Sequence, residues 1–244
     1  MKPNFLCLCV LLLPWANGAT VTNGSFEDNH TDGGSTYQPL YAGFAGLPGW
    51  RFSPSPTPVL IGTPDENYAY KTPFGRWQLD LSGSDNTTGG WIETDVTGLA
   101  AGSDYRLAFS TGTSTGFLAG GGPPSVTVSV GGTSVSLSAP PTSIIEWFPQ
   151  SVEFRASAAT MSVRFLNTSP AGTGLVSIDA VAVNPIAAPP WVTLTPLPDG
   201  QLRLEFEGVL ESSADLVGWN PSDQISGSLV SPGPGARFFR AGAR

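Results

Sequence analysis

The feature of this chain that most restricts its fold is a repeated two-residue alternation of apolar and polar side chains. The alternation recurs in short segments, most clearly in residues 104–110 (DYRLAFS) and 125–130 (SVTVSV). Successive side chains of a β-strand point to opposite faces of the sheet, so this period is typical of a half-buried strand. No long window has the 3.6-residue period of an amphipathic helix. The sequence therefore predicts an all-β fold.

Turn signals divide this pattern into many short strands. Further alternating segments cover residues 77–81, 152–154, 161–165 and 176–183. Glycine-containing turn sequences lie between them, at 89–90, 101–103, 131–132 and 171–172. Short strands separated by such turns, at a spacing of roughly 10–15 residues, indicate a β-sandwich. Glycine, proline and polar residues interrupt the pattern at 30–48 and 112–124, where we expect longer loops.

Residues 1–19 have the three-part pattern of a secretory signal peptide. A positive start at Lys2 precedes an apolar run over 5–14 and a group of small residues that ends at Ala19. Cleavage near Ala19 predicts a protein that is secreted or held at the cell surface. Cys7 and Cys9 both lie in the leader, so the mature chain is expected to fold without disulfides. Neither this run nor any later one is long enough to span a membrane as a helix, so no transmembrane segment is expected.

The chain beyond the leader is expected to form two domains. Residues 20–184 carry most of the alternating strands, and a proline-rich linker follows at 185–190. Residues 191–244 are expected to form a small β-rich C-terminal module, with a hairpin signal at Asp199-Gly200. A module of this size without disulfides has a marginal core. We therefore expect it to dock on a cell-envelope or protein partner.

Composition argues against several classes of function. The formal charge is −8, and only 12% of the residues are charged, so no basic patch for nucleic acid is expected. His30 is the one histidine, and the chain has no Gly-x-Ser-x-Gly sequence. A Ser-His-Asp hydrolase is therefore disfavoured.

Four motifs in order give the chain a resemblance to known families. They are Asn23–Glu27 (NGSFE), Leu47–Trp50 (LPGW), 102–109 (GSDYRLAF) and 178–183 (IDAVAV). Their order and spacing resemble the galactose-binding-like superfamily, in particular carbohydrate-binding modules of families 4 and 22. They also resemble the bacterial choice-of-anchor C proteins and the domain-of-unknown-function 642 proteins of plant cell walls. The resemblance implies a jelly-roll sandwich over 20–184 and non-catalytic binding of an extracellular polysaccharide.

The resemblance also implies a structural calcium ion. The matching family positions commonly hold Ca²⁺, and the corresponding residues here are Glu27, Asp179 and, less directly, Asn23. Two carboxylates on neighbouring terminal strands repel each other unless a cation or a basic group lies between them. The alternative is that Glu27 pairs with an arginine or caps a turn, while Asp179 begins a bend.

Sugar binding requires flat aromatic faces with planar polar groups beside them. The candidate aromatic residues are Tyr37, Tyr41, Trp91, Phe117 and Trp147. The candidate hydrogen-bonding residues are Arg76, Gln78 and Asp80, which flank Trp77. Each of these candidates could instead be an ordinary core or surface residue. Trp50 and Trp77 are expected in the core.

Two other functions remain open from the sequence. One is a structural or adhesive protein of the extracellular matrix or cell surface, which binds other proteins through its loop aromatics. The other is a glycoside hydrolase that uses Glu93 with Asp95 or Asp80. Residues 93 and 95 share one face of a strand at roughly 7 Å, which is compatible with a pair of catalytic carboxylates.

Overall fold

The computed structural model describes residues 18–62, 71–83, 87–114, 123–140, 142, 144–186, 190–214, 216–230 and 238–242. Most of the expected signal peptide and the candidate residue Phe117 lie outside these ranges. The chain divides into two compact units, Met1–Ile186 and Ala187–Arg244. Apart from a short 3-10 turn at Asp32–Gly34, every regular element in the described ranges is a β-strand, which confirms the predicted all-β class.

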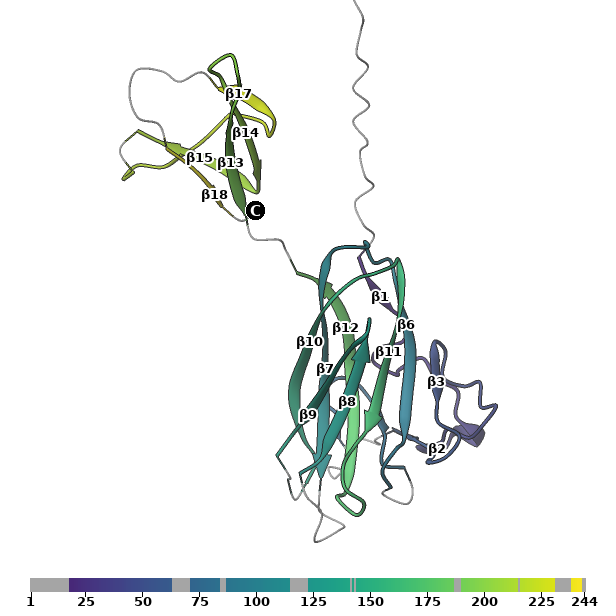
Figure 1. Cartoon of the computed structure of the whole chain (residues 1–244). Helices are drawn as coiled ribbons and strands as arrows, with labels where there is room; N and C mark the ends of the chain where they lie inside the picture. Colours follow the sequence, from purple (N-terminus) through teal and green to yellow (C-terminus); the bar gives the residue numbers. More distant parts are fainter. Residues whose placement is uncertain are drawn as a thin grey trace, which may run out of the picture. The chain divides into compact units, whose positions relative to one another are not determined.

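The first unit consists of two antiparallel sheets, and most of their strands are labelled in Figure 1. One sheet has the order β1-β6-β11-β8-β9, and β3 also pairs with β6. Its strands are β1 (Thr20–Val21), β3 (Trp50–Phe52), β6 (Trp91–Thr97), β8 (Ser125–Val130), β9 (Thr133–Ser138) and β11 (Thr160–Asn167). We call it the β6 sheet.

The other sheet has the order β10-β7-β12-β5-β4-β2 and is called the β12 sheet here. Its strands are β2 (Tyr37–Pro39), β4 (Val59–Gly62), β5 (Trp77–Asp80), β7 (Asp104–Ser114), β10 (Glu146–Arg155) and β12 (Leu175–Pro185). The first strand, β1, pairs with β6 and not with the last strand, β12. The chain reaches β12 just after β1, where the Val181 N–H donates to the Gly24 carbonyl over 2.9 Å.

The core lies between the two sheets and follows the alternation in the sequence. Tyr105, Leu107 and Phe109 on β7 are buried, as are Val126, Val128 and Val130 on β8. A line of aromatic rings crosses the core, with centroid distances of 5.0 Å for Phe26–Trp50, 6.3 Å for Trp50–Phe165 and 5.0 Å for Phe109–Phe165. Burial of these side chains removes apolar surface from water, which is the main favourable term in folding.

The two segments expected to be loops contain strand residues. Strand β2 lies within 30–48, where Tyr37 pairs with Ile61. Strand β7 continues to Ser114, so Gly112 belongs to the sheet and pairs with both Trp147 and Ser177. The local glycine content favoured a loop there, but neighbours on both sides provide hydrogen bonds that fix the extended backbone.

The second unit contains two three-stranded sheets. One consists of β13 (Trp191–Pro196), β14 (Leu202–Glu207) and β17 (Ser228–Val230), and the other of β15 (Val209–Ser213), β16 (Asn220–Pro221) and β18 (Phe238–Gly242). Gly200 has a φ of 80° in the turn between β13 and β14, a conformation that glycine adopts at little cost. In the described part of this unit, Leu204 and Leu210 are the buried large apolar side chains, so the core is small. No described helix is long and apolar enough to cross a membrane.

Candidate functional site

Four of the predicted binding residues lie on one face of the β12 sheet, the face turned away from the main core. The strand registers place Trp147, Gly112, Ser177, Asp80 and Val59 in one row across five strands. A neighbouring row contains Tyr37, Ile61 and Gln78. Tyr37 and Trp147 thus lie on the two edge strands, β2 and β10, and the polar candidates lie between them. We call this surface the outer face of the β12 sheet.

Residues 71–76 cover the middle of this face. The Trp147 indole N–H donates to the Lys71 carbonyl over 3.0 Å, and the Thr72 hydroxyl donates to the Asp179 carboxylate over 2.5 Å. The Phe74 ring meets Trp147 edge to face, with centroids 5.9 Å apart. A second, smaller apolar cluster forms on this side of the sheet from Val59, Ile61, Ile145, Leu175 and the partly buried Trp147.

The burial of two polar residues on this face corrects the prediction for Gln78 and Asp80. Both side chains are buried, so neither is a hydrogen-bonding group on an exposed strand face. The Asp80 carboxylate accepts the Ser82 N–H over 2.8 Å, which fixes the turn after β5. Burial raises the pKa of Asp80 to about 7, although hydrogen bonds to the carboxylate oppose that rise. The two residues are structural because β5 is an interior strand with covered faces on both sides.

Trp147 is the half-buried aromatic residue with the most defined position on this face. Its ring lies against the main chain at Gly112, where a Cβ atom would come within 2.9 Å of the ring. The hydrogen bond to Lys71 and the contact with Phe74 fix the ring from two further sides. An aromatic ring held in this way binds without losing much rotational freedom, which favours recognition of a ligand. The exposed Phe74 ring extends the apolar surface beside it.

The other predicted binding residues are distributed elsewhere. The Tyr41 hydroxyl donates to the Asp32 carboxylate over 2.8 Å, and its ring meets Phe44 edge to face. The guanidinium of the exposed Arg76 lies 5.7 Å from the Trp77 ring centroid. Trp91 lies on β6 and therefore belongs to the opposite sheet. The structure does not gather the predicted residues into one site.

The carboxylates of Glu27 and Asp179 are close enough to influence each other. Burial raises the pKa of Asp179 to about 7, and the charge of Glu27 adds to the increase. Asp179 accepts hydrogen bonds from the Thr72 hydroxyl and from the Ala180 N–H, over 2.5 and 2.6 Å. One oxygen of Glu27 accepts the N–H groups of Arg76 and Trp77, each over 2.8 Å. The charge of the exposed Glu27 thus acts on the buried carboxylate of Asp179.

Backbone strain accompanies this carboxylate pair. Phe26, which precedes Glu27, has a φ of 59°, and Ala180, which follows Asp179, has a φ of 53°. Such left-handed conformations cost roughly 1–2 kcal/mol for residues with a Cβ. Strain of this kind persists where the surroundings require it and is common at ligand sites.

Asn23 does not present its side chain to this pair. Its amide donates to the Asp28 carbonyl over 2.7 Å and accepts the Asp28 N–H over 3.0 Å. Asn23 is therefore a turn-forming residue, and its expected role as a ligand through the side chain is corrected. The carboxylate oxygens of Glu27 and Asp179 are of the ligand type that a hard cation such as Ca²⁺ prefers. No group of three or more His, Cys, Asp or Glu side chains with the arrangement of a metal site occurs in the described ranges.

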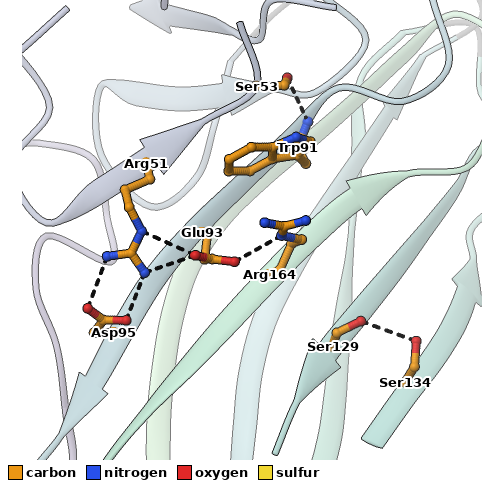
Figure 2. A network of polar contacts seen from close by, with 8 residues as sticks. All are labelled: Arg51, Ser53, Trp91, Glu93, Asp95, Ser129, Ser134 and Arg164. Carbon is orange, nitrogen blue, oxygen red and sulfur yellow. Dashed lines mark hydrogen bonds and ion pairs between the residues drawn. The ribbon is translucent and has the colours of Figure 1, made fainter. Parts of the chain in front are cut away.

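The proposed hydrolase pair, Glu93 and Asp95, is held by Arg51 (Figure 2). The guanidinium donates to Glu93 over 3.0 and 3.1 Å and to Asp95 over 2.8 and 3.0 Å. Partial burial raises the pKa of Glu93, but the hydrogen bonds from Arg51 and Arg164 outweigh this effect, so the pKa lies below its usual value. The hydrogen bond from Arg51 also lowers the pKa of Asp95.

A glycosidase requires a carboxylic acid with a raised pKa as its proton donor. Glu93 and Asp95 have the opposite shift, so they do not match that role. Pairing Glu93 with Asp80 does not match it either, because Asp80 is buried in the β12 sheet and Glu93 lies on the β6 sheet.

Arg164 is a polar residue of this surface that the sequence analysis did not identify. It lies on β11, donates through Nε to Glu93 over 2.9 Å, and places its guanidinium carbon 4.2 Å from the Trp91 ring centroid. The sequence did contain a hint of a special role for Arg164, because it is the one charged residue in the alternating segment 160–167. The contacts with Glu93 and Trp91 come from another strand, so the sequence alone did not reveal them.

No protein-family model matches the chain. A stretch of 92 residues is 39% identical to Halomucin of Haloquadratum walsbyi, and it covers 36% of this chain but only 1% of that protein.

The solved structures that resemble the chain include carbohydrate-binding modules, the class that the sequence motifs resemble. TmCBM61 in complex with β-1,4-galactotriose is 16% identical, with a TM-score of 0.41 over 69% of this chain and 99% of that chain. A CBM4 structure is also 16% identical, with a TM-score of 0.35 over 68% and 100% of the two chains. The CBM22-1 xylan-binding domain of Paenibacillus barcinonensis Xyn10C is 12% identical, with a TM-score of 0.38 over 57% and 87%.

Proposed function

We propose that the protein is a secreted, non-catalytic module that binds an extracellular polysaccharide and is stabilised by calcium. The observation that carries the proposal is the Trp147 ring, packed against Gly112 and fixed by Lys71 and Phe74 at the edge of the β12 sheet. The C–H faces of a sugar ring pack on such a flat aromatic surface. The sequence motifs, which resemble those of carbohydrate-binding modules, support the same assignment.

The absence of catalysis is part of the proposal. Arg51 and Arg164 hold Glu93 in its charged form, and they leave it no role as a proton donor. Among the described residues, the carboxyl groups with raised pKa values are those of Asp80 and Asp179, which are buried and accept main-chain N–H groups. A module of this kind retains its ligand without changing it.

Calcium is proposed at Glu27 and Asp179. A divalent cation there compensates the repulsion between the two carboxylates and replaces part of the hydration that burial removes. The ion has a structural role only: it holds the segment after β1 against β12. Binding of an ion to the folded state alone stabilises that state by linkage.

A protein or cell-envelope partner is proposed for the second unit. Several large apolar side chains of this unit are exposed, among them Val217, at 84%, and Ile225, at 75%. Trp191, Leu194 and Leu229 are also exposed. Exposed apolar side chains in this number on a small unit are typical of an interaction surface.

The Trp147→Ala variant tests polysaccharide binding. We expect the purified protein to be retained on one class of immobilised plant, algal or bacterial polysaccharide, and the variant to bind at least tenfold more weakly. The Gly112→Ala variant should weaken binding in the same direction, because its Cβ displaces the indole ring. The assay is affinity electrophoresis in gels that contain each polysaccharide.

Trp191→Ala is the matched control, since it removes an exposed tryptophan from the second unit. It should bind as the wild type does. If the folded wild type migrates freely through every polysaccharide, the proposed function is wrong. If retention is found but Trp147→Ala preserves it, Trp147 is not the binding platform.

A further inference from the structure

A continuous row of polar side chains crosses the solvent-facing side of the β6 sheet. The strand registers align Arg51, Glu93, Arg164, Ser129 and Ser134 on five neighbouring strands. Figure 2 shows Arg51 and Arg164 on either side of Glu93, with Ser129 and Ser134 farther along the same row. This row lies on the sheet opposite Trp147, so it is a separate surface from the one that carries the proposed function.

Arg164 has an unusual position within the row. Its Nε donates to Glu93, and its guanidinium stacks over Trp91, so the side chain is held from two sides. Within the described part of the chain, no hydrogen bond from its two terminal nitrogens is found, and 43% of the side chain is exposed. A planar donor group is therefore fixed in place with part of its donor capacity facing solvent.

A pocket of about 430 Å³ opens beside this guanidinium. Its lining includes Glu93, Arg164, Ser129, Ser134, Ser162 and the Gly131-Gly132 turn between β8 and β9. The volume falls within the range of roughly 300–1,000 Å³ that is common for small-ligand sites. Gly131 and Gly132 form this turn with φ values of 56° and 80°, and a Cβ atom at Gly132 would meet no heavy atom within 4 Å, so the pocket is open on the side of Gly132.

The charges around the pocket are balanced. Arg164 pairs with Glu93, and Arg51 pairs with both Glu93 and Asp95, so two guanidinium groups meet two carboxylates. The chain as a whole has a formal charge of −8. Neither the local nor the overall charge attracts an anion, and the remaining lining groups are hydroxyls and main-chain amides, which hydrogen-bond to neutral polar ligands.

We propose that this pocket is a second saccharide site, which binds one uncharged sugar residue through two adjacent hydroxyl groups. The terminal nitrogens of Arg164 donate to the two hydroxyl oxygens, and the hydroxyls of Ser129, Ser134 and Ser162 complete the hydrogen bonding. Glu93 and Trp91 position Arg164 for this contact. Two saccharide sites on opposite sheets make the first unit able to bridge polysaccharide chains, which increases retention through multivalency.

The test uses the whole protein with 15N labelling and a panel of soluble oligosaccharides. The panel contains neutral gluco-, xylo-, manno- and galacto-oligosaccharides and, as the anionic comparison, oligogalacturonate. We expect one neutral class to shift the Trp91 indole signal and the amide signals of Ser129 and Gly132, with little dependence on salt. Arg164→Gln should weaken this binding at least tenfold, and Arg164→Lys should do the same because it keeps the charge but loses the planar fork.

Arg106→Gln is the matched control, because Arg106 forms an exposed ion pair with Glu153 on the β12 sheet, at 2.7 Å. It should leave the Trp91 response unchanged, and so should Trp147→Ala, which separates this proposal from the proposed function. The proposal is overturned if no neutral sugar shifts these signals, if only oligogalacturonate does so, or if Arg164→Lys binds as the wild type does. Each variant is first compared with the wild type by thermal melting, so that loss of fold is recognised.

Discussion

Asp179→Asn is expected to make the calcium-free protein more stable than the wild type at pH 8. Burial and the nearby charge of Glu27 raise the pKa of Asp179 to about 7 in the folded state, whereas an unfolded aspartate titrates near about 3.9. The folded state therefore holds the proton more tightly. The stability from this group is fully present below about pH 4 and is lost as pH rises through about 7. Asparagine is neutral at every pH and does not suffer that loss.

The expected size of the effect is large for a single side chain. A difference of about three pKa units corresponds to about 4 kcal/mol as an upper limit, since each unit is worth about 1.4 kcal/mol. In a chelator, the wild-type melting temperature should fall between pH 5 and pH 8, and the variant should show a smaller fall. Differential scanning calorimetry at both pH values measures the difference directly.

Calcium should reverse the loss in the wild type. A cation between Glu27 and Asp179 stabilises their charged forms, so added Ca²⁺ should raise the melting temperature more at pH 8 than at pH 5. Asp179→Asn should lose most of this response. If Ca²⁺ and chelator give the same wild-type melting temperature at pH 8, the cation site is absent.

Asp80→Asn provides the matched comparison for the calcium experiment. Asp80 is also buried with a pKa raised to about 7, but Glu27 is not among the groups that shift it. This variant should also reduce the pH dependence of stability while it keeps the full response to Ca²⁺. A response to Ca²⁺ lost equally in both variants would indicate a general effect of the buried carboxyl groups, not a site at Asp179.

Phe165→Ala is expected to destabilise the first unit by about 3–5 kcal/mol, the usual range for removal of a buried aromatic side chain. Phe165 is fully buried on β11 and contacts Phe109 from the β12 sheet edge to face, with centroids 5.0 Å apart. It also meets Trp50 at 6.3 Å, so one ring connects the two sheets. Its loss leaves a cavity that rigid strands on both sides cannot close.

Urea unfolding followed by tryptophan fluorescence measures this loss, with the transition of the second unit fitted separately. Phe165→Leu keeps much of the volume and should cost clearly less than Phe165→Ala. Phe74→Ala removes an exposed phenylalanine and should have a small effect. If Phe165→Ala unfolds at the same urea concentration as the wild type, the aromatic line is not the centre of the core.

Much of the fold could be predicted because strand alternation is a local property. Tyr105, Leu107 and Phe109 alternate with polar residues, and a strand with that pattern buries one face in any sandwich. The turn at Asp199-Gly200 could also be predicted from the sequence, since Gly200 adopts the positive φ that such turns require. The pattern did not reveal that Gly112–Ser114 continue β7, because their extended backbone depends on hydrogen bonds from β10 and β12.

The candidate sites show the limit of local patterns. Gln78 and Asp80 alternate with an apolar residue in a way that suits a solvent-exposed strand face, yet β5 lies between β4 and β12 and both side chains are buried. The side chain of Arg164 is held in place by contacts with Glu93 and Trp91, which are far away in the sequence.

The sequence by itself thus determined the strand class, the buried set and the main turns, because these depend on side chains a few residues apart. Only the tertiary structure decided which strand faces are covered and which charges meet. Glu27 and Asp179 are far apart in the sequence of the first unit but influence each other in the fold, and Arg51 pairs with Glu93 across two neighbouring strands. Such encounters depend on strand order and register, which are set by the packing of the whole unit and not by any local period.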